Sequence, residues 1–107
     1  MTQAHLLLVD DDRAFGMLTQ EFLESKGLKV TLCHSGDDGW SAFRSGSFQI
    51  CVLDVKMPIR NGFHLARDIR AVDPVVPIVF LTGAHEKESR IEGFHAGADD
   101  YVTKPFS

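Results

Sequence analysis

Apolar residues occur along the chain in short continuous runs, which are separated by longer stretches of mixed character. Three of the runs consist almost entirely of Val, Ile, Leu and similar residues, which is typical of strands with both faces covered. A weaker run follows Gly27, and a short one precedes Lys104. The predicted strands are Leu6–Val9, Leu28–Cys33, Ile50–Leu53, Val75–Leu81 and Tyr101–Val102.

The stretches between these runs carry apolar residues about one helical turn apart, which indicates helices with one apolar face. Residues that commonly begin or end helices flank them, with Ser35 and Asn61 at starts and Gly27 and Gly46 at ends. The apolar positions of the four predicted helices are Phe15, Leu18 and Phe22; Trp40 and Phe43; Leu65, Ile69 and Val72; and Ile91, Phe94 and Ala98.

Strands and helices therefore alternate along the whole chain. Strict alternation predicts an α/β domain, in which helices cover both faces of a parallel sheet. The 107 residues are enough for one such domain and too few for two.

Composition then narrows the classes of protein to consider. Hydrophobic residues make up 44% and charged residues 24% of the chain, as in ordinary globular domains. The net charge of −4 argues against direct binding to nucleic acid, and no apolar run approaches the length of a membrane span. Cys33 and Cys51 lie in apolar stretches, and we interpret them as buried free thiols of a cytoplasmic protein.

Polar residues that can perform chemistry follow four of the predicted strands. They are Asp10, Asp11 and Asp12 after the first strand, Asp54 after the third, Thr82 after the fourth, and Thr103 and Lys104 after the last. Ligands of α/β sheets bind outside the carboxyl ends of the strands, which meet at one edge. We therefore expect these side chains to form a single site.

The chemistry of that site is constrained by its charge. Crowded carboxylates repel one another unless a cation lies between them, and oxygen ligands of this kind suit Mg²⁺, with Mn²⁺ as the alternative ion. The five histidines include no pair four positions apart, which disfavours zinc. The first turn reads Asp-Asp-Asp-Arg instead of a glycine-rich loop, which disfavours a flavin or nucleotide.

Four segments carry these residues, and together they identify a family. The segments are Leu6–Asp12, Val52–Pro58 with Asn61-Gly62, Phe80–Gly83 and Ala98–Phe106. In this order and spacing they resemble the receiver domain of two-component response regulators, over nearly the whole chain. The resemblance implies a flavodoxin-like, doubly wound sheet of five parallel strands in the order 2-1-3-4-5.

The resemblance also implies a role for each site residue. Asp54 would accept a phosphoryl group from a phosphohistidine on a sensor histidine kinase or a phosphotransfer protein. Asp11 would bind Mg²⁺ directly and Asp10 would bind it through water, with Asp54 and the backbone carbonyl of Lys56 as further ligands. Lys104 and the Thr82 hydroxyl would contact phosphoryl oxygens. Asp12 is better interpreted as a helix cap.

A conformational switch would follow from the same contacts. Thr82 would move toward the phosphoryl group, and Tyr101 would turn inward behind it. The change would be read on the face formed by the fourth predicted helix and the last strand.

Two other functions stay open from the residues alone. One is a Mg²⁺-dependent phosphatase or hydrolase with Asp54 as its nucleophile. Enzymes of that class usually place a second acid two residues after the nucleophile, where this chain has Lys56. The other is a flavin- or nucleotide-binding module on the same fold.

The resemblance finally implies a fifth helix after the last strand, whereas the sequence ends at Ser107. We therefore expect residues 1–107 to be a receiver domain that lacks this helix, with any effector domain farther downstream. The apolar surface beside the last strand would be covered by a second copy of the chain. That homodimer would form through the fourth-helix and last-strand face or through swapped elements.

Overall fold

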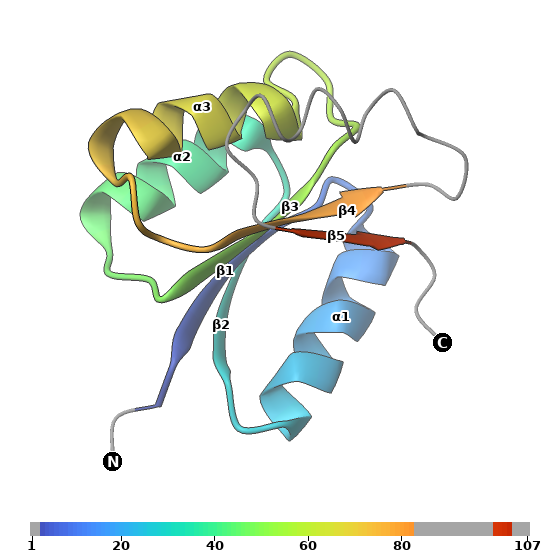
Figure 1. Cartoon of the computed structure of the whole chain (residues 1–107). Helices are drawn as coiled ribbons and strands as arrows, with labels where there is room; N and C mark the ends of the chain where they lie inside the picture. Colours follow the sequence, from blue (N-terminus) through green and yellow to red (C-terminus); the bar gives the residue numbers. More distant parts are fainter. Residues whose placement is uncertain (1–2, 83–99, 104–107) are drawn as a thin grey trace.

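The computed structural model describes residues 3–82 and 100–103, in which strands and helices alternate as the sequence predicts (Figure 1). The fourth predicted helix and Lys104 lie outside the described residues. The elements are β1 (His5–Val9), α1 (Arg13–Ser25), β2 (Lys29–Cys33), α2 (Gly36–Ser45), β3 (Ile50–Asp54), α3 (Gly62–Val72), β4 (Ile78–Thr82) and β5 (Asp100–Thr103).

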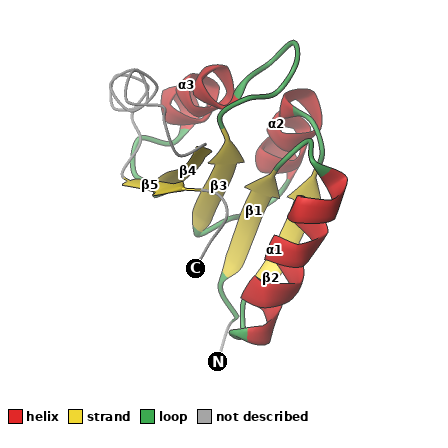
Figure 2. Cartoon of the chain, turned by 90° about the vertical axis from the view of Figure 1, so that its right-hand side faces the viewer, coloured by secondary structure: helices red, strands yellow, loops and turns green. Residues whose placement is uncertain are grey.

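The five strands form one parallel sheet in the order β2-β1-β3-β4-β5. This order confirms the doubly wound, flavodoxin-like arrangement. Helices α2 and α3 cover one face of the sheet, and α1 covers the other (Figure 1). The arrows of β1 and β3 point the same way, so their carboxyl ends lie at one edge (Figure 2).

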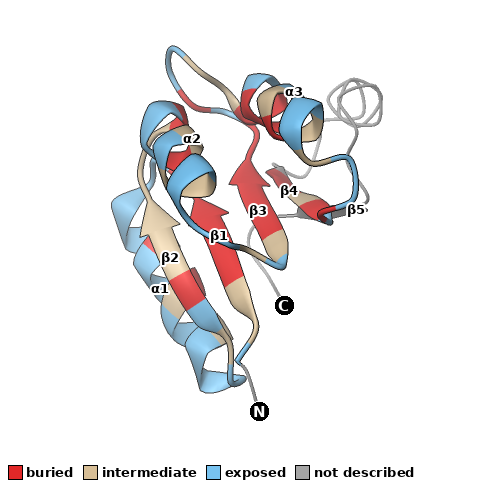
Figure 3. Ribbon diagram, turned by 90° about the vertical axis from the view of Figure 1, so that its left-hand side faces the viewer, coloured by how far each residue is buried: buried red, intermediate tan, exposed pale blue. Residues whose placement is uncertain are grey.

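The central strands are buried on both faces, which explains their nearly continuous apolar sequences (Figure 3). Alternate residues of β1 point to opposite faces of the sheet. Leu7 and Val9 join the core beneath α2 and α3, whereas Leu6 and Leu8 join the core beneath α1. Two apolar layers therefore hold β1 in place.

The predicted helix ends agree with the structure. Ser35 and Asn61 cap α2 and α3, and each side chain accepts a hydrogen bond from an amide three residues later. The chain leaves α1 through Gly27, whose φ of 92° is favourable for glycine alone.

The buried face of α1 differs from the apolar stripe in the sequence. Leu18 and Phe22 are 64% and 54% exposed, and the buried residues of the helix are Gly16 and Thr19. A methyl group on Gly16 would lie only 3.2 Å from Leu32 Cδ1. The helix thus approaches the sheet through small residues, with Phe15 and Leu23 packed against the core and Leu18 and Phe22 on the outer side.

Both cysteines are free thiols, as predicted, although only Cys51 is fully buried and Cys33 is half-buried. Burial raises the pKa of the Cys51 thiol to about 12, and it also raises the pKa of Cys33. Among the described residues, no helix combines the length and apolar character needed to cross a bilayer.

Strand β4 begins three residues later than the apolar run that predicted it. Asp73 ends α3, and its Oδ1 accepts hydrogen bonds from the amides of Val75 and Val76 at 2.9 and 3.0 Å. These bonds form a turn that keeps Val75 82% exposed and outside the strand.

Replacing Asp73 with Ala should therefore lower stability in a pH-dependent way. The amides of Val75 and Val76 donate to the Asp73 carboxylate and hold its pKa below the ordinary value. A carboxyl with a lowered folded pKa stabilises the protein above its unfolded pKa, and the contribution is lost as pH falls through the folded value. We expect Asp73→Ala to unfold at lower urea concentration than wild type at pH 7. The difference should narrow in acid, and a gap that stays constant with pH would contradict this origin.

Candidate functional site

Three carboxylates meet at the carboxyl edge of the sheet, where β1 and β3 lie side by side. Asp10 and Asp11 follow β1, and Asp54 is the last residue of β3. One carboxylate oxygen from each lies within 4.8 Å of the other two. The structure thus brings together the three acidic residues that the sequence proposes as metal ligands.

The burial of these residues leaves the cluster open on one side. Asp10 is 0% and Asp54 is 7% exposed, whereas Asp11 faces solvent. Two unit charges at this separation repel by about 3 kcal/mol in an effective dielectric of about 20. A hard divalent cation such as Mg²⁺ would offset that repulsion, and these carboxylates, with water, supply the oxygen ligands that it prefers. The residues present therefore fit such an ion.

Asp10 is held by several groups around it. Its amide donates to the Cys33 carbonyl at 3.0 Å, and its Oδ1 accepts from the Asp12 amide at 3.0 Å. Its backbone carbonyl lies 3.0 Å from Nδ1 of His34. Strand β2 and the first turn after β1 therefore both restrain this residue.

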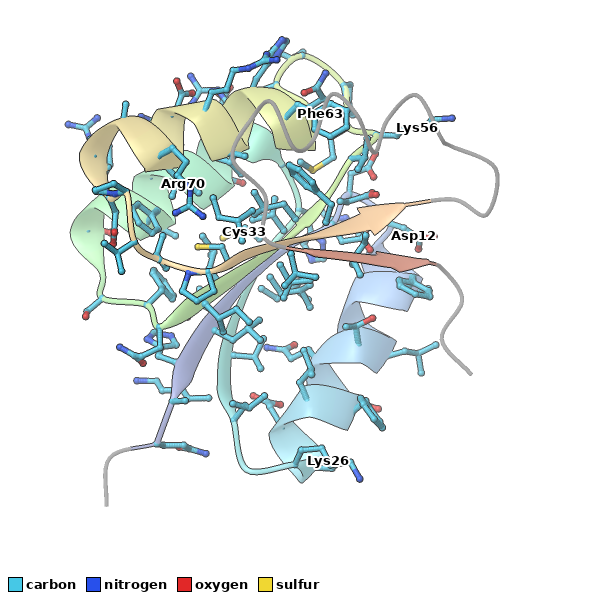
Figure 4. The ribbon with its side chains drawn as sticks, in the orientation of Figure 1. Asp12, Lys26, Cys33, Lys56, Phe63 and Arg70 are labelled. Atoms are coloured by element: carbon cyan, nitrogen blue, oxygen red, sulfur yellow. The ribbon has the colours of Figure 1, made fainter. Side chains whose placement is uncertain are left out.

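Asp12 acts as a cap, as the sequence predicts. Its Oδ1 accepts a hydrogen bond from the Phe15 amide at 3.0 Å, which satisfies one of the free donors at the start of α1. Figure 4 shows Asp12 at the same end of the sheet as Lys56. The third acid of the motif thus orients the helix that follows the site.

Loss of this cap should reduce stability without removing any of the proposed metal ligands. We expect Asp12→Ala to lower the free energy of unfolding by about 0.5–2 kcal/mol and Asp12→Asn by much less, since Asn also caps helices. Urea unfolding followed by the fluorescence of Trp40, the single tryptophan, measures the difference. Both variants should bind Mn²⁺ as wild type does. A loss of binding in Asp12→Asn would make Asp12 a ligand instead.

Backbone hydrogen bonds hold the loop between β3 and α3 against the strand ends that carry the site. The amide of Gly62 donates to the Val55 carbonyl at 3.1 Å, and the amide of Val55 donates to Leu81 of β4 at 3.1 Å. A Cβ atom on Gly62 would collide with the carbonyl oxygen of Asp54. Glycine is therefore required for the loop to pass directly against the residue that carries the third carboxylate.

The same loop contains a strained residue and an ion-pair anchor. Ile59 has a φ of 69°, which is unusual for a β-branched residue, and its side chain is 94% exposed. The guanidinium of Arg60 lies 3.2 Å from Asp37 of α2 and 3.3 Å from Asp68 of α3. Arg60 therefore ties the loop to both neighbouring helices.

A side chain at position 62 should disturb this loop strongly. The colliding atoms belong to the backbone of Asp54 and Val55 and cannot rotate away. We expect Gly62→Ala to lower the free energy of unfolding by about 1–3 kcal/mol, in the range of overpacked sites. The matched control is Gly16→Ala, where the nearest atom belongs to a leucine side chain that can move. Equal effects of the two substitutions in urea unfolding would contradict the interpretation.

Of the other predicted site residues, Thr82 and Lys56 follow the same edge of the sheet, Tyr101 lies within β5, and Lys104 lies outside the described part. Thr82 is the last residue of β4, and β4 pairs with β3 through Leu81 and Asp54. Tyr101 of β5 pairs with Phe80 of β4. Lys56 is exposed and belongs to the loop after β3, whereas Lys104 lies outside the described residues.

His34 was not among the site residues that the sequence predicted. It entered only as one of five histidines, no two of which lie four positions apart as a pair of metal ligands would. Its position directly after β2, at the edge where the acidic residues follow β1 and β3, is the signal that could have identified it.

Comparison with known proteins agrees with this geometry. The family model of the response regulator receiver domain matches residues 6–107. The chain therefore belongs to the receiver domain family of response regulators.

Relatives and solved structures support the same assignment. The chain is 47% identical to the transcriptional regulatory protein RprY of Bacteroides fragilis and 48% identical to the protein PetR of Rhodobacter capsulatus, in each case over 95% of its own length. It spans 43% of the length of each of these relatives. The chemotaxis protein CheY4 of Vibrio cholerae has a similar structure, with a TM-score of 0.94 and 27% identity, over 99% of this chain and 90% of that one.

Proposed function

We propose that this receiver domain accepts a phosphoryl group on Asp54 from a phosphohistidine, in a reaction that depends on Mg²⁺. The donor would be a sensor histidine kinase or a phosphotransfer protein. The observation that carries the proposal is the cluster of Asp10, Asp11 and Asp54, whose carboxylates lie within 4.8 Å of one another at the open edge of the sheet. Family membership supports it independently.

The proposed chemistry makes Asp54 the nucleophile and gives Asp10 and Asp11 the task of holding the ion. A carboxylate oxygen of Asp54 attacks phosphorus, the bond from phosphorus to the imidazole nitrogen of the donor breaks, and that nitrogen keeps the electron pair. Asp10 and Asp11, with Asp54 and the carbonyl of Lys56, would hold Mg²⁺. When bound, this ion offsets the negative charge that the carboxylates and the phosphoryl oxygens bring together.

Two further residues belong to the proposed reaction. Lys104 would pair with one phosphoryl oxygen, and the Thr82 hydroxyl would donate to another. The backbone pairing of β3 with β4 places Thr82 directly beyond the position opposite Asp54, which supports its part in this proposal.

The output belongs to the proposal as well. Phosphorylation would draw Thr82 toward Asp54, and Tyr101 would follow, which changes the face around the last strand. Curated relatives that extend beyond this domain are named transcriptional regulatory proteins, so transcription is the proposed output of a longer chain. A homodimer through this face would transmit the change. The acidic receiver itself would not contact DNA.

The domain would act as a signalling module that catalyses its own phosphorylation and dephosphorylation, without turning over a metabolite. A cytoplasmic setting is part of this proposal. Two free thiols are consistent with a reducing compartment.

Phosphorylation by acetyl phosphate tests the proposal directly. We expect wild-type protein to gain one phosphoryl group, read as intact mass, only when Mg²⁺ is present. Asp54→Asn should gain none, because its amide is not a nucleophile. Asp38→Asn, which neutralises an exposed aspartate on α2, should behave as wild type.

Three outcomes would contradict the proposal. Phosphate release over many turnovers would favour a hydrolase, and the absence of any phosphoryl addition to wild type would show an inactive receiver. Addition to Asp54→Asn would place the acceptor elsewhere.

A further inference from the structure

The side chain of His34 contacts the backbone of Asp10, one of the three residues of the carboxylate cluster. The pairing of β1 with β2 ends at Val9 and Cys33, and the amide of Asp10 donates to the Cys33 carbonyl just beyond it. After His34 the chain turns away into α2, with Ser35 as the helix cap. His34 Nδ1 lies 3.0 Å from the Asp10 carbonyl oxygen. It supplies a donor to Asp10 at the point where the strand pairing stops.

The carbonyl that His34 contacts belongs to the peptide group between Asp10 and Asp11. A peptide group is planar, so its orientation sets the directions in which both flanking residues leave it. These residues carry two of the three carboxylates that meet within 4.8 Å. Rotation of this one peptide would therefore separate the carboxylates of the cluster.

The surroundings of His34 restrict its ring. The residue is half-buried, and a methyl group on Gly16 of α1 would lie 3.7 Å from its Cε1 and 3.7 Å from Cβ of Asp10. The ring thus lies beside the start of α1, where even a methyl group on Gly16 would make only ordinary van der Waals contact with it. A carbonyl oxygen can only accept, so Nδ1 carries the hydrogen of this bond.

We propose that His34 is a positioning residue, which orients the Asp10–Asp11 peptide so that the carboxylates can bind a divalent cation. It touches neither the ion nor the phosphoryl group. Its effect on phosphorylation rests on the proposed function, whereas its effect on metal binding does not. Partners that orient metal ligands commonly change metal affinity by about 10–100-fold when they are lost.

Binding of Mn²⁺ alone tests this role, measured as the loss of the electron paramagnetic resonance signal of the free ion. We expect His34→Ala to raise the dissociation constant about tenfold, at the low end of that range, because the backbone amides around Asp10 remain. The Nδ2 of Asn can occupy the position of the His Nδ1 donor, so His34→Asn should restore affinity to near the wild-type value. The matched control is His64→Ala, at an exposed histidine on α3, and it should leave affinity unchanged.

Rescue by His34→Asn separates positioning from packing, because Asn replaces the donor and not the ring. Wild-type affinity in His34→Ala overturns the inference, as does an equal loss in His34→Ala and His34→Asn. A wild-type protein that binds no Mn²⁺ overturns it as well. Urea unfolding of each variant confirms that the affinities refer to folded protein.

Acetyl phosphate treatment of the same variants keeps the two proposals apart. If wild type binds Mn²⁺ but gains no phosphoryl group, the proposed function fails and the metal-binding result for His34 stands. If wild type is phosphorylated and His34→Ala needs no more Mg²⁺ than wild type, the inference about His34 fails and the proposed function stands.

Discussion

Repulsion among three carboxylates at one edge of the sheet is the constraint on which the rest of the site depends. Unfolded chains keep such charges apart in water, but the fold brings them within 4.8 Å and buries two of them. That arrangement requires a rigid frame, which the two apolar layers on either side of β1 and β3 provide. A divalent cation would offset this repulsion, and that requirement links the fold to the proposed phosphoryl chemistry.

Hydrogen bonds, ion pairs and one close backbone approach set the geometry around these charges. Asp10 is restrained by the Cys33 carbonyl and the Asp12 amide. Gly62 lets the next loop pass against the Asp54 carbonyl, and Arg60 ties that loop to α2 and α3. The strain at Ile59 lies in the same loop, where these anchors hold the chain in place.

Much of this arrangement was predictable from local pattern. The structure has the predicted parallel strands, in the order that the family resemblance implied. It also has the predicted helix caps at Asp12, Ser35 and Asn61. Two features were not predictable. The stripe of Leu18 and Phe22 marked a helix but not its buried face, because small residues control how closely α1 approaches the sheet. The late start of β4 follows from the turn that Asp73 makes with two amides.

The sequence by itself determined the class of fold and the acidic chemistry of the site, because period and motif are local properties of a chain. It could place Asp10, Asp11 and Asp54 at one site, since all parallel strands deliver their ends to one edge. Only the tertiary structure decided how these carboxylates are held. The contact of His34 with the Asp10 carbonyl joins residues 24 positions apart and depends on the pairing of β1 with β2. Such a contact leaves no periodic pattern or motif in the sequence, because it forms only when the sheet brings the two residues together.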